Sequence, residues 1–247
     1  MKTFSLTDTG IVREMNQDYY FMSETAVGNL PNLFIVADGM GGHKAGDYAS
    51  RYSTQRVVAS ITRNPGDQPV TILKEAIEKA NELLVIESKE DENKAGMGTT
   101  IVAAVIEDSQ LYVANVGDSR LYVIGDTIMQ ITKDHSLVNE MVRMGEIDES
   151  QARVHPDKNI ITRAIGASEH VEVDFFEVDL SKDDTILLCS DGLTNMVSDE
   201  QILEIIKKND TPQKQVTELV KTANNNGGRD NITAMIVKPF SDEVKIC

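Results

Sequence analysis

The alternation of apolar and polar residues along the chain first indicates where its strands lie. Residues 33–39 (LFIVADG) and 186–192 (ILLCSDG) are continuous apolar runs that each end in an acid followed by glycine. Short runs of this kind, bounded by turn residues, are typical of strands buried on both faces. Residues 171–180 (VEVDFFEVDL) instead alternate apolar and polar side chains, which predicts a strand with one face in solvent.

Three other segments have the patterns of helices. In residues 71–88 the apolar side chains recur every three or four positions, so one face of a helix would be apolar. Ser198 and Gln201 have the spacing of a capping box ahead of further apolar residues, which predicts a helix start. Pro212, directly after Thr211, predicts another.

The remaining strands are predicted in two places. Residues 99–134 contain apolar segments separated by short turns with Asp or Gly, which predicts a meander of antiparallel strands. Residues 231–238 (NITAMIVK) predict a last strand. Because helices alternate with antiparallel strand runs, we expect an α+β fold with sheets in the middle and helices outside. No repeat or linker divides the chain, so we expect one domain over residues 1–247.

The composition excludes several classes of function. A formal net charge of −16 opposes binding to nucleic acid or to an anionic membrane, so we expect neither partner. The N-terminus lacks the apolar core of a signal peptide, and no stretch reaches the length of a membrane span. The two cysteines, Cys189 in an apolar run and Cys247 at the end, do not form a disulfide framework, so a cytoplasmic location is expected.

Five acids occupy positions that folding alone does not require. They lie at the ends of apolar runs or beside Asn, Arg or Ser, and are Asp18, Asp38, Asp118, Asp191 and Asp230. A carboxylate at the rim of a core needs a cation or a hydrogen-bond network. Oxygen ligands alone would favour Mg²⁺ or Mn²⁺. Each acid taken singly is more typical of an ordinary turn, whereas the five together leave a metal site and plain turns both open.

Other chemistries are disfavoured. The glycines after Asp38 do not have dinucleotide-loop spacing, no P-loop motif occurs, and no serine lies in a nucleophile-elbow context. His43 is read as a turn or helix-start residue. Arg13 lies five residues before Asp18 and is interpreted either as an ion-pair partner or as a fork that binds an oxyanion.

Eight short motifs resemble, in order, those of the PPM family, the metal-dependent type 2C serine/threonine protein phosphatases. They cover nearly the whole chain and are TDTGIVREMNQD (7–18), ADGMGGH (37–43), GTT (98–100), VGDSR (116–120), TKDHS (132–136), TRAIG (162–166), SDGL (190–193) and GRDNIT (228–233). The form ADGMGGH is similar to that of small bacterial members, which often oppose a serine/threonine kinase.

The resemblance implies a four-layer αββα sandwich, two central antiparallel sheets flanked by helices, with a binuclear Mn²⁺ or Mg²⁺ centre at one end. Carried over by motif, Asp38 would bridge both metals and the Gly39 carbonyl would bind one of them. Asp191 and Asp230 would complete the ligand set of the other metal. Asp18 would reach the centre directly or through water.

The same resemblance implies further roles. Asp118 would hold a third, weaker metal together with Asp191. Arg13 would bind the substrate phosphate, Asn231 would support Asp230, and His43 is kept as a supporting residue only.

Two positions depart from the family pattern. Gln17 stands where many members have Glu, and Met40 stands where many have a His that is suggested as general acid. The segment around 137–165 resembles the variable flap that flanks the cleft and tunes substrate choice.

The sequence therefore predicts a monomeric Mn²⁺- or Mg²⁺-dependent phosphatase that hydrolyses phosphoserine and phosphothreonine with a metal-activated water. Its partners would be phosphorylated proteins and a cognate serine/threonine kinase. A catalytically inactive phosphatase-like module is disfavoured because all five acids are present. Another two-metal phosphoesterase, such as a nuclease, is disfavoured by the acidic surface.

Overall fold

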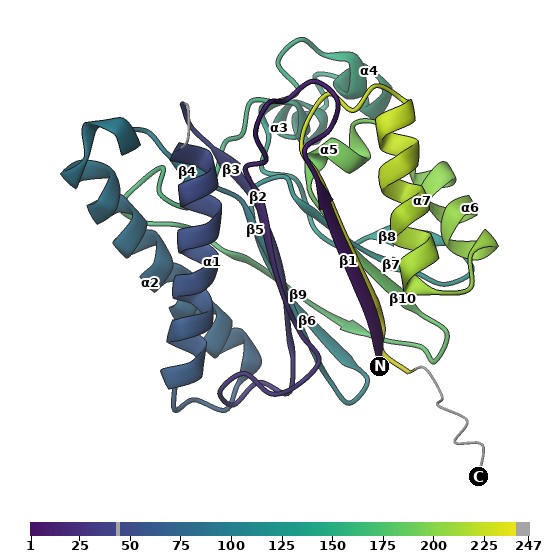
Figure 1. Ribbon diagram of the computed structural model, residues 1–247, viewed down its shortest axis with the longest axis horizontal. Coiled ribbons are helices and arrows are strands. Elements are labelled where there is room, and N and C mark those ends of the chain that lie inside the picture. The colour runs from purple at the N-terminus through teal and green to yellow at the C-terminus, as the bar shows by residue number, and fades with distance from the viewer. Residues whose placement is uncertain (43–44, 241–247) are drawn as a thin grey trace.

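Two antiparallel β-sheets pack face to face, and each is covered on its outer side by helices (Figure 1). The structure is a computed structural model that describes residues 1–42 and 45–240. His43 and Cys247 lie outside the described residues. The four-layer αββα arrangement expected from the family resemblance is confirmed.

One sheet has five strands and the other has six. The order in the first is β1 (Lys2–Asp8), β11 (Ile232–Lys238), β10 (Thr185–Cys189), β7 (Arg120–Ile124) and β8 (Ile128–Gln130). The order in the second is β2 (Asp18–Ser23), β3 (Leu33–Met40), β5 (Ile101–Glu107), β6 (Gln110–Val116) and β9 (Asp174–Asp179), with the short β4 (Gly98–Thr99) pairing with β3.

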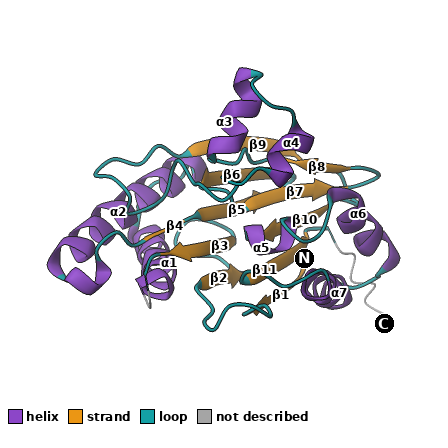
Figure 2. Cartoon of the chain, turned by 90° about the horizontal axis from the view of Figure 1, so that it is seen from above, coloured by secondary structure: helices purple, strands orange, loops and turns teal. Residues whose placement is uncertain are grey.

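The helices form the two outer layers and a separate projection. α1 (Ala45–Arg63) and α2 (Pro69–Glu90) cover the six-stranded sheet and are followed by a short 3₁₀ helix, η1 (Glu92–Lys94). α5 (Asp191–Thr194), α6 (Asp199–Lys208) and α7 (Pro212–Asn225) lie on the five-stranded sheet. Figure 2 shows α3 (Leu137–Met144) and α4 (Glu149–Val154) standing outside both layers, in the segment expected to be a flap.

The central strands are apolar throughout because both of their faces are buried. In β3, Leu33, Ile35 and Ala37 pack toward the helices, whereas Phe34 and Val36 pack between the two sheets. β10 and β11 divide their side chains in the same way. A strand with a core on each side leaves no position for polar alternation, which explains the runs seen in the sequence.

Several sequence predictions are confirmed in detail. The helix expected over 71–88 is α2, and the capping box of Ser198 and Gln201 opens α6. The hydroxyl of Thr211 accepts a hydrogen bond from the Lys214 N–H at the start of α7. The half-exposed strand is β9, which lies at an edge of its sheet.

The predicted meander over 99–134 is wrong in one respect. β5 and β6 form a hairpin in the six-stranded sheet, but β7 and β8 form a hairpin in the other sheet. The chain changes sheet at Gly117, which has a φ of +107° and lies against Thr100. Apolar segments separated by short turns predict strands, but they carry no information about which sheet each strand joins.

Substitution of Gly192 tests how closely α5 must approach Asn231, the residue directly before β11. A Cβ at this position would overlap the carbonyl oxygen of Asn231, so we expect Gly192→Ala to destabilise the protein by about 1–3 kcal/mol. This is opposite in sign to the usual gain of about 1 kcal/mol for Gly→Ala in a helix. The measurement is the urea-unfolding midpoint. Gly42→Ala is the control, because among the described residues no atom beyond its chain neighbours lies within 4 Å of its Cβ position; equal midpoints for both variants would contradict the prediction.

Candidate metal centre

The five acids singled out in the sequence come together at one end of the sandwich. Each lies at or beside the end of a strand: Asp18 opens β2, Asp38 is near the end of β3, Asp118 follows β6, Asp191 follows β10, and Asp230 precedes β11. Asp18, Asp118, Asp191 and Asp230 all raise the pKa of Asp38 by charge repulsion, in addition to the larger effect of burial. Both sheets therefore contribute carboxylates to a single cluster.

Strand register places two of the acids side by side. Asp18 and Asp38 are direct partners between the antiparallel strands β2 and β3, so their side chains lie on the same face. The backbone around Asp38 is fixed by Thr100, whose hydroxyl accepts from the Asp38 N–H at 2.9 Å. The Asp38 carbonyl accepts from the Thr99 hydroxyl at 2.8 Å. Asp38 is thus mounted on a rigid, doubly anchored strand end.

Asp18 connects the two sheets through one of its carboxylate oxygens. The hydroxyls of Ser190 and Thr233 each donate to Asp18 Oδ2 at 2.7 Å. Its other oxygen, Oδ1, is buried and receives no hydrogen bond. Burial raises the pKa of Asp18 to about 7 against the effect of the two hydroxyls, and repulsion from Asp191 and Asp230 adds to the rise.

Asp191 and Asp230 lie on the side of the five-stranded sheet. Burial and repulsion from Asp230 raise the pKa of Asp191 to about 6, although a hydrogen bond from Asp38 opposes the rise. The Asn195 side-chain amide donates to Asp191 Oδ2 at 2.9 Å. Asp230 Oδ1 accepts from the Asn231 N–H at 2.9 Å, and the supporting role expected of Asn231 stays a prediction.

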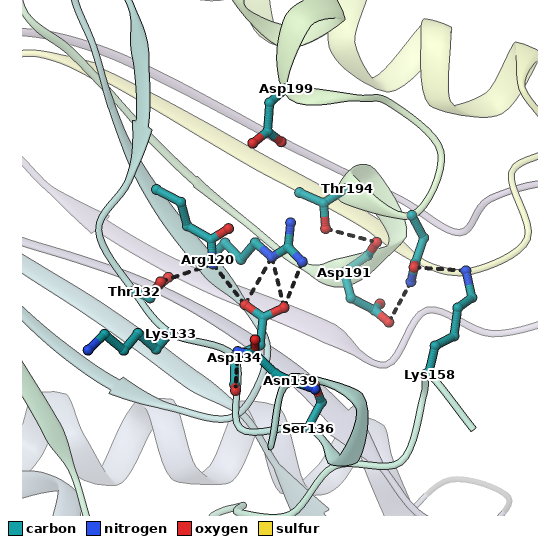
Figure 3. Close-up of polar contacts among 12 residues, drawn as sticks. Arg120, Thr132, Lys133, Asp134, Ser136, Asn139, Lys158, Asp191, Thr194 and Asp199 are labelled. Atoms are coloured by element: carbon teal, nitrogen blue, oxygen red, sulfur yellow. Dashed lines mark hydrogen bonds and ion pairs between the residues drawn. The ribbon is translucent and has the colours of Figure 1, made fainter. Parts of the chain in front are cut away.

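Asp118 and Asp191 line a cleft of about 550 Å³ whose wall also includes residues of the flap. Burial, followed by repulsion from Asp191 and Asp134, raises the pKa of Asp118 well above the ordinary value. Asp118 Oδ1 is buried without a hydrogen-bond partner. Figure 3 shows that Arg120, the nearby cation, is instead engaged by Asp134, with Arg120 Nη2 and Asp134 Oδ2 separated by 2.6 Å.

Arg13 forms the ion pair that its sequence position suggested. Its Nη2 lies 2.8 Å from Asp230 Oδ2, and about half of the Arg13 side chain is exposed. The loop that carries Arg13 is held by Asn231, whose amide donates to the carbonyls of Thr9 and Met15, both at 2.9 Å. The guanidinium is therefore positioned beside the carboxylates, and its proposed contact with phosphate stays a prediction.

The carboxylates fit hard divalent cations by their chemistry. Three buried carboxylate oxygens, Asp18 Oδ1, Asp118 Oδ1 and Asp191 Oδ1, receive no hydrogen bond from an N–H or hydroxyl donor. Four carboxyls have raised pKa values because they are buried close to one another. Divalent cations with oxygen ligands would relieve this repulsion, so the residues fit Mn²⁺ or Mg²⁺.

The side chains of the cluster do not yet have the geometry of a complete metal-coordination site. Across residues 1–42 and 45–240, no group of three or more His, Cys, Asp or Glu side chains is arranged to hold an ion as it stands. Asp230 is engaged by Arg13. We expect ion binding to replace this contact.

Three other positions named from the sequence, Gly39, Gln17 and Met40, pack against neighbouring backbone. Gly39 is tightly enclosed, because a Cβ there would overlap the Gly46 carbonyl and lie 2.6 Å from the Gln17 carbonyl oxygen. Its role as a carbonyl ligand stays a prediction. The Gln17 amide lies against Gly46, and the Met40 side chain lies against Gly98.

Three contributing residues were not identified from the sequence. Ser190 and Asn195 lie one residue before and four residues after Asp191, so helical spacing was an available signal for Asn195. Ser190 and Thr233 lie within the motifs SDGL and GRDNIT, but the sequence assigned neither of them a role. Only the packing of the two sheets brings its hydroxyl to Asp18.

Comparison with known proteins identifies relatives over nearly the whole chain. A family model described as protein phosphatase 2C matches residues 14–232. The sequence is 42% identical over 240 residues to the serine/threonine phosphatase stp of Listeria monocytogenes, which covers 94% of this chain and 93% of the relative.

Solved structures show the same fold. The crystal structure of serine/threonine phosphatase Stp1 from Staphylococcus aureus is similar with a TM-score of 0.89 and 36% identity, covering 95% of this chain and 93% of that one. The catalytic domain of the serine/threonine protein phosphatase PstP, in complex with two manganese ions, is similar with a TM-score of 0.83 and 31% identity, covering 95% and 96% of the two chains.

The raised carboxyl pKa values predict how the stability of the metal-free protein depends on pH. In the unfolded chain Asp18 and Asp191 titrate near 3.8, whereas in the folded chain they titrate near 7 and 6. Between these values the folded state binds more protons than the unfolded state, so this cluster lowers the free energy of unfolding as pH rises. We expect unfolding in urea with EDTA to show this loss between about pH 4 and 7, and Mn²⁺ to reverse it.

The variant Asp191→Asn distinguishes the effect of the carboxylate cluster on stability from the effect of other titrating groups. Without this charge, the metal-free variant should lose less stability than the wild type over the same pH range. An identical pH dependence in both proteins would show that the carboxylate cluster is not the cause.

Proposed function

Because the chain belongs to the protein phosphatase 2C family, we propose that its carboxylate cluster is the site at which phosphate is removed from serine and threonine residues of phosphorylated proteins. The observation that carries the proposal is the convergence of five acids from both sheets, three of them with a buried oxygen that has no donor. The likeness to the manganese complex of PstP supports it.

The metal ligands are proposed from the cluster and the family resemblance together. Mn²⁺ or Mg²⁺ would be held by Asp38, the Gly39 carbonyl, Asp191, Asp230 and Asp18, with Asp118 and Asp191 available for a third ion. When bound, the metal pair supplies an activated water and Lewis-acid stabilisation of the phosphoryl oxygens. The apolar strands β3 and β10 hold Asp38 and Asp191 in place for that chemistry.

Arg13 is proposed to bind the phosphate group of the substrate. Its planar guanidinium can donate two parallel hydrogen bonds to phosphate oxygens. The present partner of Arg13 is Asp230, which is itself a proposed metal ligand. Metal binding at Asp230 would release the guanidinium toward the substrate, while Asn231 continues to hold the loop.

The proton for the departing serine or threonine oxygen does not come from residue 40. The thioether of Met40 has no proton to donate. The proposal therefore assigns this proton to solvent or to another group of the cleft. No phosphorylated enzyme intermediate is required, since water is the attacking group.

Further parts of the proposal concern the setting of the enzyme. We propose that the whole chain forms one phosphatase domain with a flap over about 137–165. We also propose that it acts as a monomer in the cytoplasm and opposes a serine/threonine kinase. Among the described residues, none of the helices is long and apolar enough to cross a membrane.

Replacing a proposed bridging ligand should remove the reaction. Asp38→Asn should lower Mn²⁺-dependent phosphate release from a phosphothreonine peptide by more than about a hundredfold, because losing a partner that only orients a ligand already costs about 10–100-fold. Excess EDTA should do the same to the wild type. Asp67→Asn, an exposed acid in the loop between α1 and α2, is the control and should retain full activity. Full activity of Asp38→Asn would refute the assignment.

Replacing Arg13 should weaken substrate binding more than turnover. Arg13→Ala removes charge-assisted hydrogen bonds worth about 1.5–3 kcal/mol, so we expect KM for the phosphopeptide to rise about 10–100-fold with a smaller change in kcat. Steady-state kinetics at saturating Mn²⁺ provide the measurement. Arg63→Ala, at the far end of α1, is the matched control. An unchanged KM in Arg13→Ala would remove the phosphate-binding role.

A further inference from the structure

Asn195 connects the proposed metal ligand Asp191 to the flap. Its side-chain amide nitrogen donates to Asp191 Oδ2 at 2.9 Å. Its side-chain oxygen accepts from Lys158 Nζ at 3.1 Å. Figure 3 shows Lys158 reaching from the segment after α4 toward the Asp191 side of the cleft. One amide thus joins two segments that are separated by more than thirty residues in sequence.

The chemistry of the two partners sets the orientation of the amide. A carboxylate accepts hydrogen bonds only, and an ammonium group donates them only. The NH₂ end of Asn195 must therefore face Asp191, and its oxygen must face Lys158. Leucine has the same shape but makes neither bond, and aspartate retains the bond to Lys158 while it repels Asp191.

Helix α5 fixes the position of the amide relative to Asp191. The backbone N–H of Asn195 donates to the Asp191 carbonyl at 2.8 Å, so the two residues are one helical turn apart and on the same face. The amide binds Oδ2 alone, whereas the buried Oδ1 receives no bond from an N–H or hydroxyl donor. The contact therefore fixes the rotation of the carboxylate while Oδ1 remains available for a cation.

Lys158 belongs to the wall of the cleft that the flap provides. It lines the cleft together with Asn139 and Glu149 of the flap helices and with Asp118 and Asp191 of the carboxylate cluster. Its segment is tied to the start of α3, because the Leu137 N–H donates to the Ile160 carbonyl at 2.9 Å. Lys158 also attracts the Asp191 carboxylate electrostatically. A movement of this wall would thus be transmitted to Asp191.

We propose that Asn195 is a positioning residue that orients the Asp191 carboxylate for metal binding and, through Lys158, couples occupation of the metal centre to the position of the flap. The proposal rests on the proposed function, since it takes Asp191 as a metal ligand. Coupling of this kind acts in both directions, so a change in the flap must alter metal affinity by the same factor that metal binding alters the flap.

Mn²⁺ affinity tests the positioning role directly. Isothermal titration calorimetry of Asn195→Leu should show a dissociation constant for Mn²⁺ about 10–100-fold weaker than that of the wild type. The thermal midpoint of the metal-free variant should stay close to that of the wild type, since the residue lies at an accessible helix end and a merely structural loss would lower it. The control is Asn93→Leu, whose amide donates to Asp91 within its own turn, and its Mn²⁺ affinity should not change.

Hydrogen exchange tests the connection to the flap. Adding Mn²⁺ to the wild type should slow amide exchange over residues 155–160, because a fixed Asp191 holds Asn195 and thereby Lys158. Lys158→Met keeps the side-chain stem but removes the charge, so this slowing should disappear while Mn²⁺ affinity falls only about twofold to fivefold. Lys214→Met, on the exposed first turn of α7, is the control and should behave as the wild type.

The outcomes separate this proposal from the proposed function. A wild-type protein that binds no Mn²⁺ would overturn the metal centre and this proposal together. Equal Mn²⁺ affinity in the wild type and Asn195→Leu would overturn the positioning role alone. Persistence of the Mn²⁺-dependent slowing in Lys158→Met would overturn the coupling to the flap.

Discussion

Repulsion among buried carboxylates is the constraint on which the rest of this structure depends. Asp18, Asp38, Asp118 and Asp191 have raised pKa values because each is buried near the others. Such a cluster stays together only if the surrounding frame prevents the side chains from turning away to solvent. The frame here consists of strand ends from two sheets, joined by the hydroxyl contacts of Asp18 to Ser190 and Thr233.

The same frame explains why the cluster is stable and why it is suited to divalent cations. The three apolar cores, one between the sheets and one under each helix layer, supply the burial energy that offsets the repulsion. Protein groups satisfy one oxygen of Asp18 and one of Asp191, and they leave the other buried without a donor. A site of this kind is weakened by its own charges until cations neutralise them, so metal binding contributes to the stability of the fold as well as to catalysis.

The site lies between the core strands and the projecting flap helices, and each of these parts contributes differently to the proposed function. Asp38 and Asp191 are mounted on the core strands or directly after them, whereas Arg13 lies on a loop fixed by Asn231. The flap helices form the opposite wall of the cleft. In the proposed function, the core strands would set the geometry of the reaction, and the flap would be the part that varies with the substrate. Asn195 and Lys158 form a polar connection between the two.

The sequence by itself determined the strands and helices with strong patterns, and with them the family, the fold class and the five acids. Continuous runs such as LFIVA and the caps at Ser198 and Thr211 depend on local burial and local hydrogen bonds, which the order of residues encodes directly. Helix α1 was not predicted from the sequence, beyond the reading of His43 as a turn or helix-start residue. Its buried face is built largely from small residues such as Gly46, Ala49 and Ser50, which give no apolar stripe. The switch of the chain between sheets at Gly117, and the contacts of Asp18 with Thr233 and of Asn195 with Lys158, were decided by the tertiary structure. They join residues far apart in the chain, and only the packing of the layers brings such residues within hydrogen-bonding distance.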